Sequence, residues 1–189
     1  MTIKNTDNSY GTIAKAFHWV MFLILLGMVA VGYYMYELPA DTPQQMGYKF
    51  GLYDYHKSFG ILILLLVVLR LGWRMINPVP KMPGGMRKIE IFSAHAMHVL
   101  LYIMMFIQPL SGWLMSSYGG HPVKFFGSVL PALADKDKAL GDIFHEVHEI
   151  TAALLIALFA IHVAAALFHH FIRKDDVMKK MLPHREQAE

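Results

Sequence analysis

Four of the eleven histidines lie in or at the edge of long apolar runs: His18, His56, His148 and His162. An ionisable side chain surrounded by hydrocarbon is costly, and it marks a functional position by default. His148 and His162 stand fourteen residues apart in one apolar run, which in a helix is about 21 Å along the axis and about 40° around it. One helix face therefore presents an imidazole near each side of a bilayer core about 30 Å thick. Because imidazole is a common axial ligand of haem iron, the pattern predicts two stacked metal–porphyrin sites.

Other histidines have simpler explanations, and a single histidine on an apolar face is more often a hydrogen-bonded core residue than a ligand. His145 precedes His148 by three residues and shares its helix face, so it is an alternative ligand. It stands beside Glu146, closer to the preceding loop, and we expect it to be solvated. His169 and His170 end the last apolar run, where the helix dipole alone favours cations.

Two arginines, a glycine and a further histidine pair could line the same sites. Arg70 and Arg74 lie one turn apart and could bind haem propionates bidentately, although anchoring at the membrane surface explains them equally well. Gly60 follows His56 by four residues and could allow a flat macrocycle to approach the backbone, or it could be a helix contact. His95 and His98 could donate to a propionate or to a quinone carbonyl; hydrogen bonds to backbone or lipid are the alternative.

The composition predicts an integral membrane protein. Of the 189 residues, 56% are hydrophobic and 16% are charged, whereas soluble domains carry about 25% charged residues. The chain has no cysteine, which excludes disulfides, cysteine-ligated iron–sulfur clusters and covalent haem attachment. Four apolar runs, about residues 17–36, 55–73, 91–115 and 148–172, are long enough to span a bilayer as helices. We therefore expect an all-α, integral membrane four-helix bundle, with residues 1–189 as a single membrane domain.

The basic residues predict how the bundle is oriented. Twelve of the seventeen lie in the N-terminal tail, in residues 70–90 and in the C-terminal tail, and the other five lie in residues 37–57 and 116–147. The positive-inside rule then places both termini in the cytoplasm.

This orientation gives each histidine a depth. The first span enters from the cytoplasm, so His18 lies near the cytoplasmic face. The second and fourth spans enter from outside, which places His56 and His148 near the outer face and His162 deeper. The depths pair His18 with His162 and His56 with His148, and two such sites stacked across a membrane form a path for electrons.

With these residues assigned, the chain resembles the bacterial cytochrome b561 family of four-helix dihaem membrane proteins, from about Ile13 to Pro183. The segments that carry the resemblance are Ala16–Trp19, His56–Gly60, Arg70–Arg74, His95–His98, Leu101–Tyr102, His148–Glu149 and His162–His170. Their order and spacing, rather than any one motif, make the likeness specific. The resemblance implies that His18, His56, His148 and His162 are the haem ligands.

The family resemblance also implies a function. It implies two b haems and electron exchange with ubiquinone in the bacterial inner membrane, with no nucleic-acid partner. One branch of the family oxidises superoxide on the periplasmic side and passes the electron to ubiquinone, which makes superoxide the implied small-molecule reductant. Lysines in the outer loops could attract this anion, although acidic residues in the same loops offset their field. These lysines are Lys49, Lys57, Lys124, Lys136 and Lys138.

Two other classes of function stay open. The protein could be a non-enzymatic cytochrome subunit that relays electrons or anchors a partner, and residues 116–147 are long enough to dock a periplasmic redox protein. It could also be a small metal or proton transporter whose histidines bind ions directly. Transporters often show internal repeats and broken helices, and the sequence shows neither. It identifies no catalytic side chain and does not place the quinone.

Overall fold

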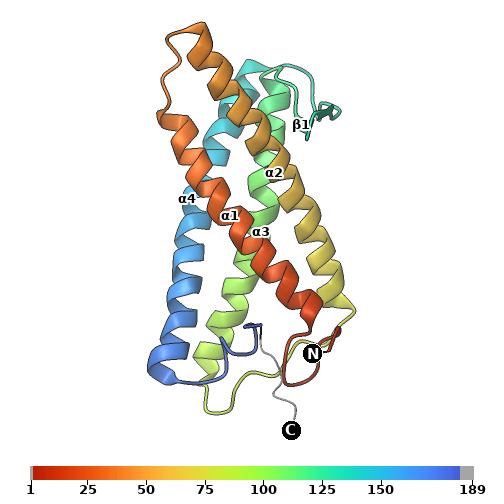
Figure 1. Cartoon of the computed structure of the whole chain (residues 1–189), viewed down its shortest axis with the longest axis vertical. Coiled ribbons are helices and arrows are strands. Elements are labelled where there is room, and N and C mark those ends of the chain that lie inside the picture. Colours follow the sequence, from red (N-terminus) through yellow and green to blue (C-terminus); the bar gives the residue numbers. More distant parts are fainter. Residues whose placement is uncertain (1, 184–189) are drawn as a thin grey trace.

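The computed structural model describes residues 2–183, which form a bundle of four long helices (Figure 1). The helices are α1 (Thr12–Glu37), α2 (Pro43–Met75), α3 (Lys88–Tyr118) and α4 (Lys138–Leu167), and a π-helical turn, η1 (Phe168–Arg173), continues α4. A short antiparallel hairpin, β1 (Lys124–Phe125) and β2 (Ser128–Val129), lies between α3 and α4. All four helices are long and apolar enough to cross a membrane, so the predicted all-α membrane bundle is confirmed.

The helices extend beyond the apolar runs that the sequence suggested. The second run begins near residue 55, yet α2 begins at Pro43, where the Thr42 side chain accepts from Gln45 N and the Gln45 side chain accepts from Thr42 N. The fourth run begins at residue 148, yet α4 begins at Lys138 after an Asp137 cap. An apolar run marks only the part of a helix that can lie in the hydrocarbon core. The first residue of the helix is set by the capping side chains, which bind the free backbone N–H groups of the first turn.

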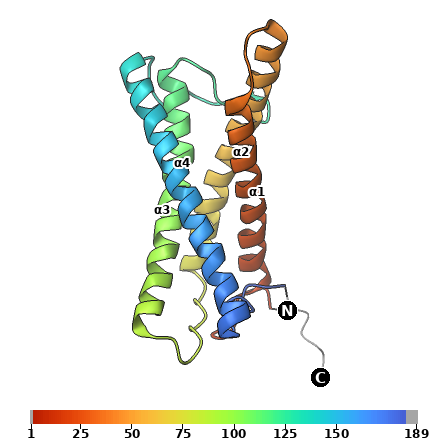
Figure 2. The same ribbon diagram turned by 90° about the vertical axis from the view of Figure 1, so that its left-hand side faces the viewer.

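The helices pack as two pairs around a small apolar core. α3 and α4 share the most extensive contact, followed by α1 with α2 and then α2 with α3 (Figure 2). One buried cluster takes residues from all four helices and consists of Met21, Ile63, Val67, Met105 and Leu155. Leu155 lies seven residues from both His148 and His162, about 10 Å along the helix from each. The core therefore separates two levels of histidines along the bundle.

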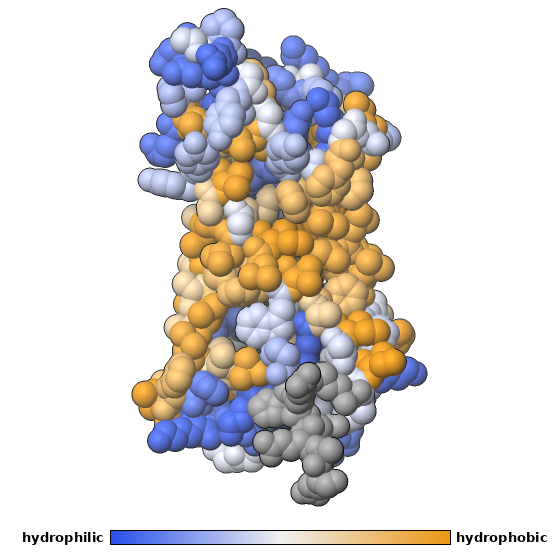
Figure 3. Space-filling model, in the orientation of Figure 1, coloured by the Kyte–Doolittle hydropathy of each residue, from blue (hydrophilic) through white to orange (hydrophobic). Residues whose placement is uncertain are grey.

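The outer surface of the bundle is apolar where a bilayer would surround it. On the face that Figure 3 shows, a hydrophobic band covers the middle of the molecule, and hydrophilic residues gather at both ends. Large apolar side chains on the helices point outward, among them Leu23, Leu65, Val99 and Ile156, which are 64%, 48%, 57% and 44% exposed. A soluble monomer rarely exposes so continuous an apolar surface, so the band is the lipid-facing surface of a multi-pass membrane protein.

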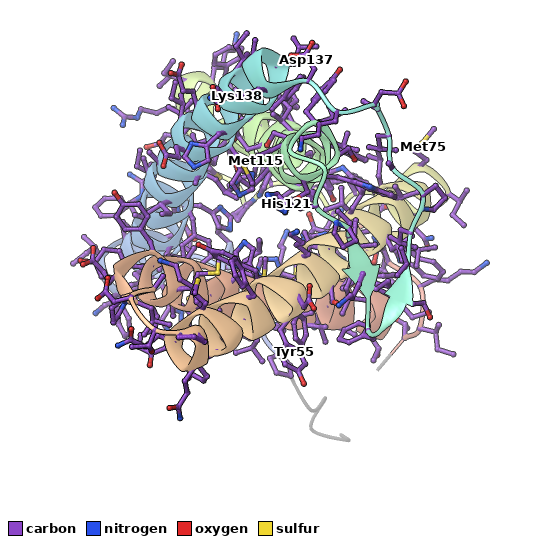
Figure 4. The ribbon with its side chains drawn as sticks, turned by 90° about the horizontal axis from the view of Figure 1, so that it is seen from above. Tyr55, Met75, Met115, His121, Asp137 and Lys138 are labelled. Carbon is purple, nitrogen blue, oxygen red and sulfur yellow. The ribbon has the colours of Figure 1, made fainter. Side chains whose placement is uncertain are left out.

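The two ends of the bundle differ in how they are closed. The terminal end consists of residues 2–11, 76–87 and 174–183. Two hydrogen bonds join the N-terminal segment to the loop after α2: Asn5 Nδ2 donates to the Pro78 carbonyl (2.9 Å), and Lys81 N donates to the Asp7 carbonyl (2.9 Å). Trp19 Nε1 of α1 donates to the Met181 carbonyl (2.9 Å) and so ties the C-terminal segment to the same end. The hairpin end, seen from above in Figure 4, carries β1 and β2 against α2, while Tyr55 of α2 points outward.

Candidate functional site

Three helices bring histidines together at the terminal end of the bundle. The imidazoles of His18 (α1) and His162 (α4) have ring centroids 6.2 Å apart, with an angle of 66° between their planes. His98 of α3 lies on the other flank, with its ring centroid 5.5 Å from that of His162. Arg70 of α2 completes the group, since its Nη2 lies 3.3 Å from His18 Nδ1. We call these four residues the terminal-end cluster.

Positive charge and aromatic rings surround the terminal-end cluster. The Arg70 guanidinium lies over the Tyr102 ring, 5.6 Å from its centroid, which is within cation–π range. Tyr10 of the N-terminal segment packs near Arg70 and Arg74; burial raises the pKa of its hydroxyl, and the two arginine charges offset part of that rise. Two arginines held in a partly buried site suit an anionic ligand such as a carboxylate.

The second pair of histidines, the hairpin-end pair, consists of His56 of α2 and His148 of α4. His148 Nδ1 lies 3.0 Å from the Gln108 carbonyl oxygen and 3.1 Å from Ser111 Oγ, and its Nε2 lies 3.1 Å from Gln108 Nε2. His56 Nδ1 is buried and has no hydrogen-bond partner within residues 2–183. The two imidazoles of this pair are thus held very differently.

Glycines of α1 and α3 make room for the hairpin-end pair. A Cβ atom at Gly32 would lie 3.4 Å from His56 Cε1, and one at Gly112 would lie 3.0 Å from His148 Cε1. The Gly112 distance is tighter than ordinary packing, so glycine at this position lets α3 approach the His148 ring closely, whereas the Gly32 distance is at the edge of ordinary van der Waals contact. Gly60, by contrast, has only ordinary space around it, because a Cβ there would meet Met28 Cε at 3.9 Å; its contact with a macrocycle stays a prediction.

The spacing of His18 and His162 in the terminal-end cluster fits a metal–porphyrin held between two imidazoles. Metal–nitrogen bonds of about 2 Å on opposite faces of one metal put the two ring centres about 6 Å apart, and the His18 and His162 centroids are 6.2 Å apart. At the other level, His56 Nδ1 has no hydrogen-bond partner within residues 2–183, whereas both ring nitrogens of His148 are hydrogen-bonded, so His148 would bind a metal through Nε2 only after the Gln108 amide moves away. Neutral imidazole nitrogens are the donor set that haem iron prefers.

The remaining predicted site residues lie near the terminal-end cluster. A cavity of about 590 Å³ opens between α2 and α3 on its flank. Arg74, His95, His98 and Tyr102 are its polar lining, and Leu71, Val79, Val99, Ile103 and Phe106 form the rest. His95 is exposed and His98 is half-buried, so the cavity has one wetter and one drier histidine.

The other histidines take structural or solvated positions. His145 is exposed, with Nε2 3.8 Å from Glu149 Oε1, as expected for a solvated residue. His169 Nδ1 lies 2.5 Å from Asp175 Oδ2, where the chain leaves η1. Burial acts to raise the pKa of the Asp175 carboxyl, but hydrogen bonds from His169 and Val177 N outweigh it, and the pKa is lowered. This pair holds the end of the last helix.

Of the lysines predicted to lie in outer loops, Lys57 belongs to α2 and Lys138 begins α4, and their charges are less free than the sequence suggested. Lys124 forms an ion pair with Asp54 (2.8 Å) and Lys138 forms one with Asp142 (2.6 Å). Lys57 donates instead to the Pro122 carbonyl, which carries no formal charge. The loop field is therefore weaker than a count of lysines implies.

Sequence reasoning missed the residues that surround the hairpin-end pair. Gln108 and Ser111 hydrogen-bond to His148, and at Gly32 and Gly112 an added Cβ would meet the ring of His56 or His148; none of these four residues was predicted. A signal was present for one of them, since an amide within an apolar span is itself costly and suggests a role. The glycines gave no such signal, because a glycine in a membrane helix is common.

Comparison with known proteins agrees with this geometry. Residues 9–184 match the family model described as prokaryotic cytochrome b561. The chain is 37% identical to "Cytochrome b561 homolog 2" of Escherichia coli (strain K12), over 96% of this chain and 95% of that protein. It is 30% identical to "Cytochrome b561 homolog 1" of the same strain, over 89% and 94%. A Yersinia pestis protein named "Probable superoxide oxidase CybB" is 24% identical, over 92% and 96%.

Proposed function

The chain belongs to the prokaryotic cytochrome b561 family, and on that premise we propose that it carries two b haems and transfers electrons from superoxide to ubiquinone. Membership makes it a membrane electron-transfer protein with b-type haem, and the four apolar helices make it a multi-pass protein of the bacterial inner membrane. One observation carries the proposal. His18 lies beside His162 near one end of the bundle, His56 and His148 lie toward the other end, and an apolar core separates the two levels.

We assign the side chains accordingly. His18 and His162 would hold one haem, and His56 and His148 would hold the other. Haem held by these imidazoles would supply reversible one-electron transfer. Arg70 and Arg74 are placed to bind anionic carboxylates at the terminal end, and the apolar core excludes water from the space between the levels.

The cavity between α2 and α3 supports ubiquinone as the acceptor. Its apolar lining suits an isoprenoid-bearing ring, while His95, His98 and Tyr102 can donate hydrogen bonds to quinone carbonyls. His98 also contacts His162, so a ring in the cavity would be close to the terminal-end cluster. Two superoxide ions oxidised to dioxygen release two electrons, which with two protons convert one quinone to quinol. The exposed His95 could supply those protons from the aqueous side.

Three observations support superoxide as the donor. A relative named as a probable superoxide oxidase matches almost the whole chain. The positive-inside rule places the hairpin end outside. Lys57 of α2, next to His56, donates its hydrogen bond to the Pro122 carbonyl rather than to a carboxylate. A small anion would therefore meet some positive charge beside the hairpin-end pair.

The test combines a haem count with rapid kinetics on the purified protein. We expect two extractable b haems per chain, reduction of one haem by superoxide before the other, and reoxidation by a short-chain ubiquinone without a partner protein. His95→Phe should raise the quinone KM and leave the haem spectrum unchanged, while His145→Phe, at an exposed site, should leave both unchanged. If superoxide reduces neither haem while a periplasmic protein or quinol does, the relay interpretation replaces this one.

A further inference from the structure

The hairpin between α3 and α4 lies on the flank of the bundle, against α2. Figures 1 and 4 show β1 and β2 to one side of the helices, and β1 packs on α2. The Phe126 ring at the hairpin tip meets the Phe59 ring of α2 edge-on, with centroids 5.4 Å apart and an angle of 84° between their planes. Phe59 is an exposed residue of a helix that is apolar enough to span a membrane. The hairpin tip is therefore continuous with the lipid-facing surface.

Phe126 has a backbone conformation that its side chain makes costly. The tip joins Phe125 to Ser128, which pair across the hairpin, through two residues of positive φ, Phe126 (47°) and Gly127 (97°). This is a type I′ turn, whose first central position is normally asparagine, aspartate or glycine. A bulky residue is rare in the left-handed region. Packing on Phe59 does not account for the choice, because Phe126 is still 52% exposed.

Side chains of α2 bind the backbone polar groups on the side of the hairpin segment that faces the bundle. Ser58 Oγ lies 2.9 Å from the Lys124 carbonyl and accepts from Phe126 N (3.0 Å), and Lys57 Nζ donates to the Pro122 carbonyl (3.2 Å). A backbone group without a partner is costly beside lipid, and each of these three groups has one. The tip can therefore lie at the edge of the hydrocarbon core.

The height of Phe59 along α2 places the tip at that edge. Phe59 precedes Arg74 by fifteen residues, which is about 22 Å along the helix axis. Arg74 stands where the apolar part of α2 ends, and the hydrocarbon core is about 30 Å thick. A ring packed on Phe59 therefore lies just inside the opposite boundary of the core. Val129 of β2 adds another exposed apolar side chain near the tip.

We propose that the hairpin is an interfacial anchor, which seats the Phe126 ring beside Phe59 in the acyl-chain edge of the leaflet at the hairpin end. Aromatic side chains favour this boundary, and an apolar group on a surface segment binds a membrane in proportion to the area that it buries there. The anchor fixes the depth of α2 and so of His56, which precedes Phe59 by three residues. This lipid contact forms whether or not the histidines bind haem.

The test measures the depth of spin labels on the full chain in vesicles of phosphatidylethanolamine and phosphatidylglycerol. Because the chain has no cysteine, single labels can be placed at Phe126→Cys, at the lipid-facing Leu23→Cys and at the exposed Asn8→Cys. Collisions with dissolved oxygen should exceed those with a water-soluble nickel chelate at Phe126 and Leu23, and the reverse should hold at Asn8. A label at Phe126 as open to nickel as the label at Asn8 would overturn the anchor and leave the tip free to bind a soluble protein.

A second comparison keeps Phe126 in the reference protein. Here Ser128→Cys carries the label, alone or combined with Phe126→Asn or with Phe59→Ala. Asparagine suits the first position of a type I′ turn, so Phe126→Asn keeps the hairpin and removes its apolar tip. Nickel access at the label should rise with Phe126→Asn and stay near the reference with Phe59→Ala, which leaves the Phe126 ring in place. An equal rise in both would show that contact between the two rings holds the tip, and no rise in either would show that Phe126 does not set its depth. Both results overturn the anchor.

Discussion

At the scale of single residues, a glycine can matter as much as the histidine it faces. Gly112 allows α3 to lie against the His148 ring, and a Cβ there would be 3.0 Å from Cε1 and 3.2 Å from Nδ1. Gly27 on α1 has nothing within 4 Å of its Cβ position. The two glycines look alike in the sequence, and the structure gives them opposite roles.

We therefore expect Gly112→Ala to displace His148 and to lower the haem content from two per chain to one. Overpacking of this kind costs about 1–3 kcal/mol, which exceeds the gain of about 1 kcal/mol that alanine brings to a helix. Gly27→Ala should keep both haems and should unfold at a slightly higher temperature. Haem-to-protein ratios measure the first effect. A Gly112→Ala protein with two haems and unshifted spectra would show that the ring tolerates the added methyl group.

What the sequence could predict at this scale was the type and depth of the histidines. Burial cost singles out an ionisable residue in an apolar run, and helix geometry gives its height. Which atoms face which depends on how helices rotate about their axes, and no spacing within one helix determines that. Gln108 and Ser111 were missed for this reason.

At the scale of elements, one buried serine holds the hairpin to α2. Ser58 is 2% exposed, and its Oγ lies 2.8 Å from the Asp54 carbonyl and 2.9 Å from the Lys124 carbonyl while accepting from Phe126 N (3.0 Å). The hairpin is therefore fixed within one turn of His56. The sequence showed a loop at 116–147 and could not show this attachment, because it joins residues more than sixty positions apart.

Ser58→Ala should release the hairpin without disturbing the bundle. Leaving a buried donor and acceptor unpaired costs about 1–3 kcal/mol, and the weakest structure nearby is the two-residue ladder of β1 and β2. Hydrogen exchange should speed up across residues 123–130, while α3 and α4 keep their protection. Ser128→Ala, at an exposed position of β2, is the matched control. Equal exchange in the two variants would mean that the Asp54–Lys124 ion pair holds the hairpin instead.

At the scale of the whole molecule, composition and periodicity were enough for the fold. Four apolar runs that must each span a bilayer leave few arrangements other than a bundle, and the histidine depths already paired His18 with His162, which the structure brings together. The packing order of the helices and the closure of the terminal end were not predictable, because both depend on contacts between segments far apart in the chain.

The orientation of the bundle in the membrane is the whole-molecule property on which the direction of electron flow depends. The terminal end collects the N-terminal segment, the loop between α2 and α3 and the segment after η1, which carry most of the basic residues, so it should face the cytoplasm. The absence of cysteine makes this directly measurable, since an introduced thiol has no background. Asn8 at the terminal end and Ser128 on β2 are both exposed. In intact spheroplasts, a membrane-impermeant maleimide should label Ser128→Cys and should reach Asn8→Cys only after lysis. The reverse pattern would put the hairpin-end pair on the cytoplasmic side, and a periplasmic reductant could then no longer meet His56 and His148 first.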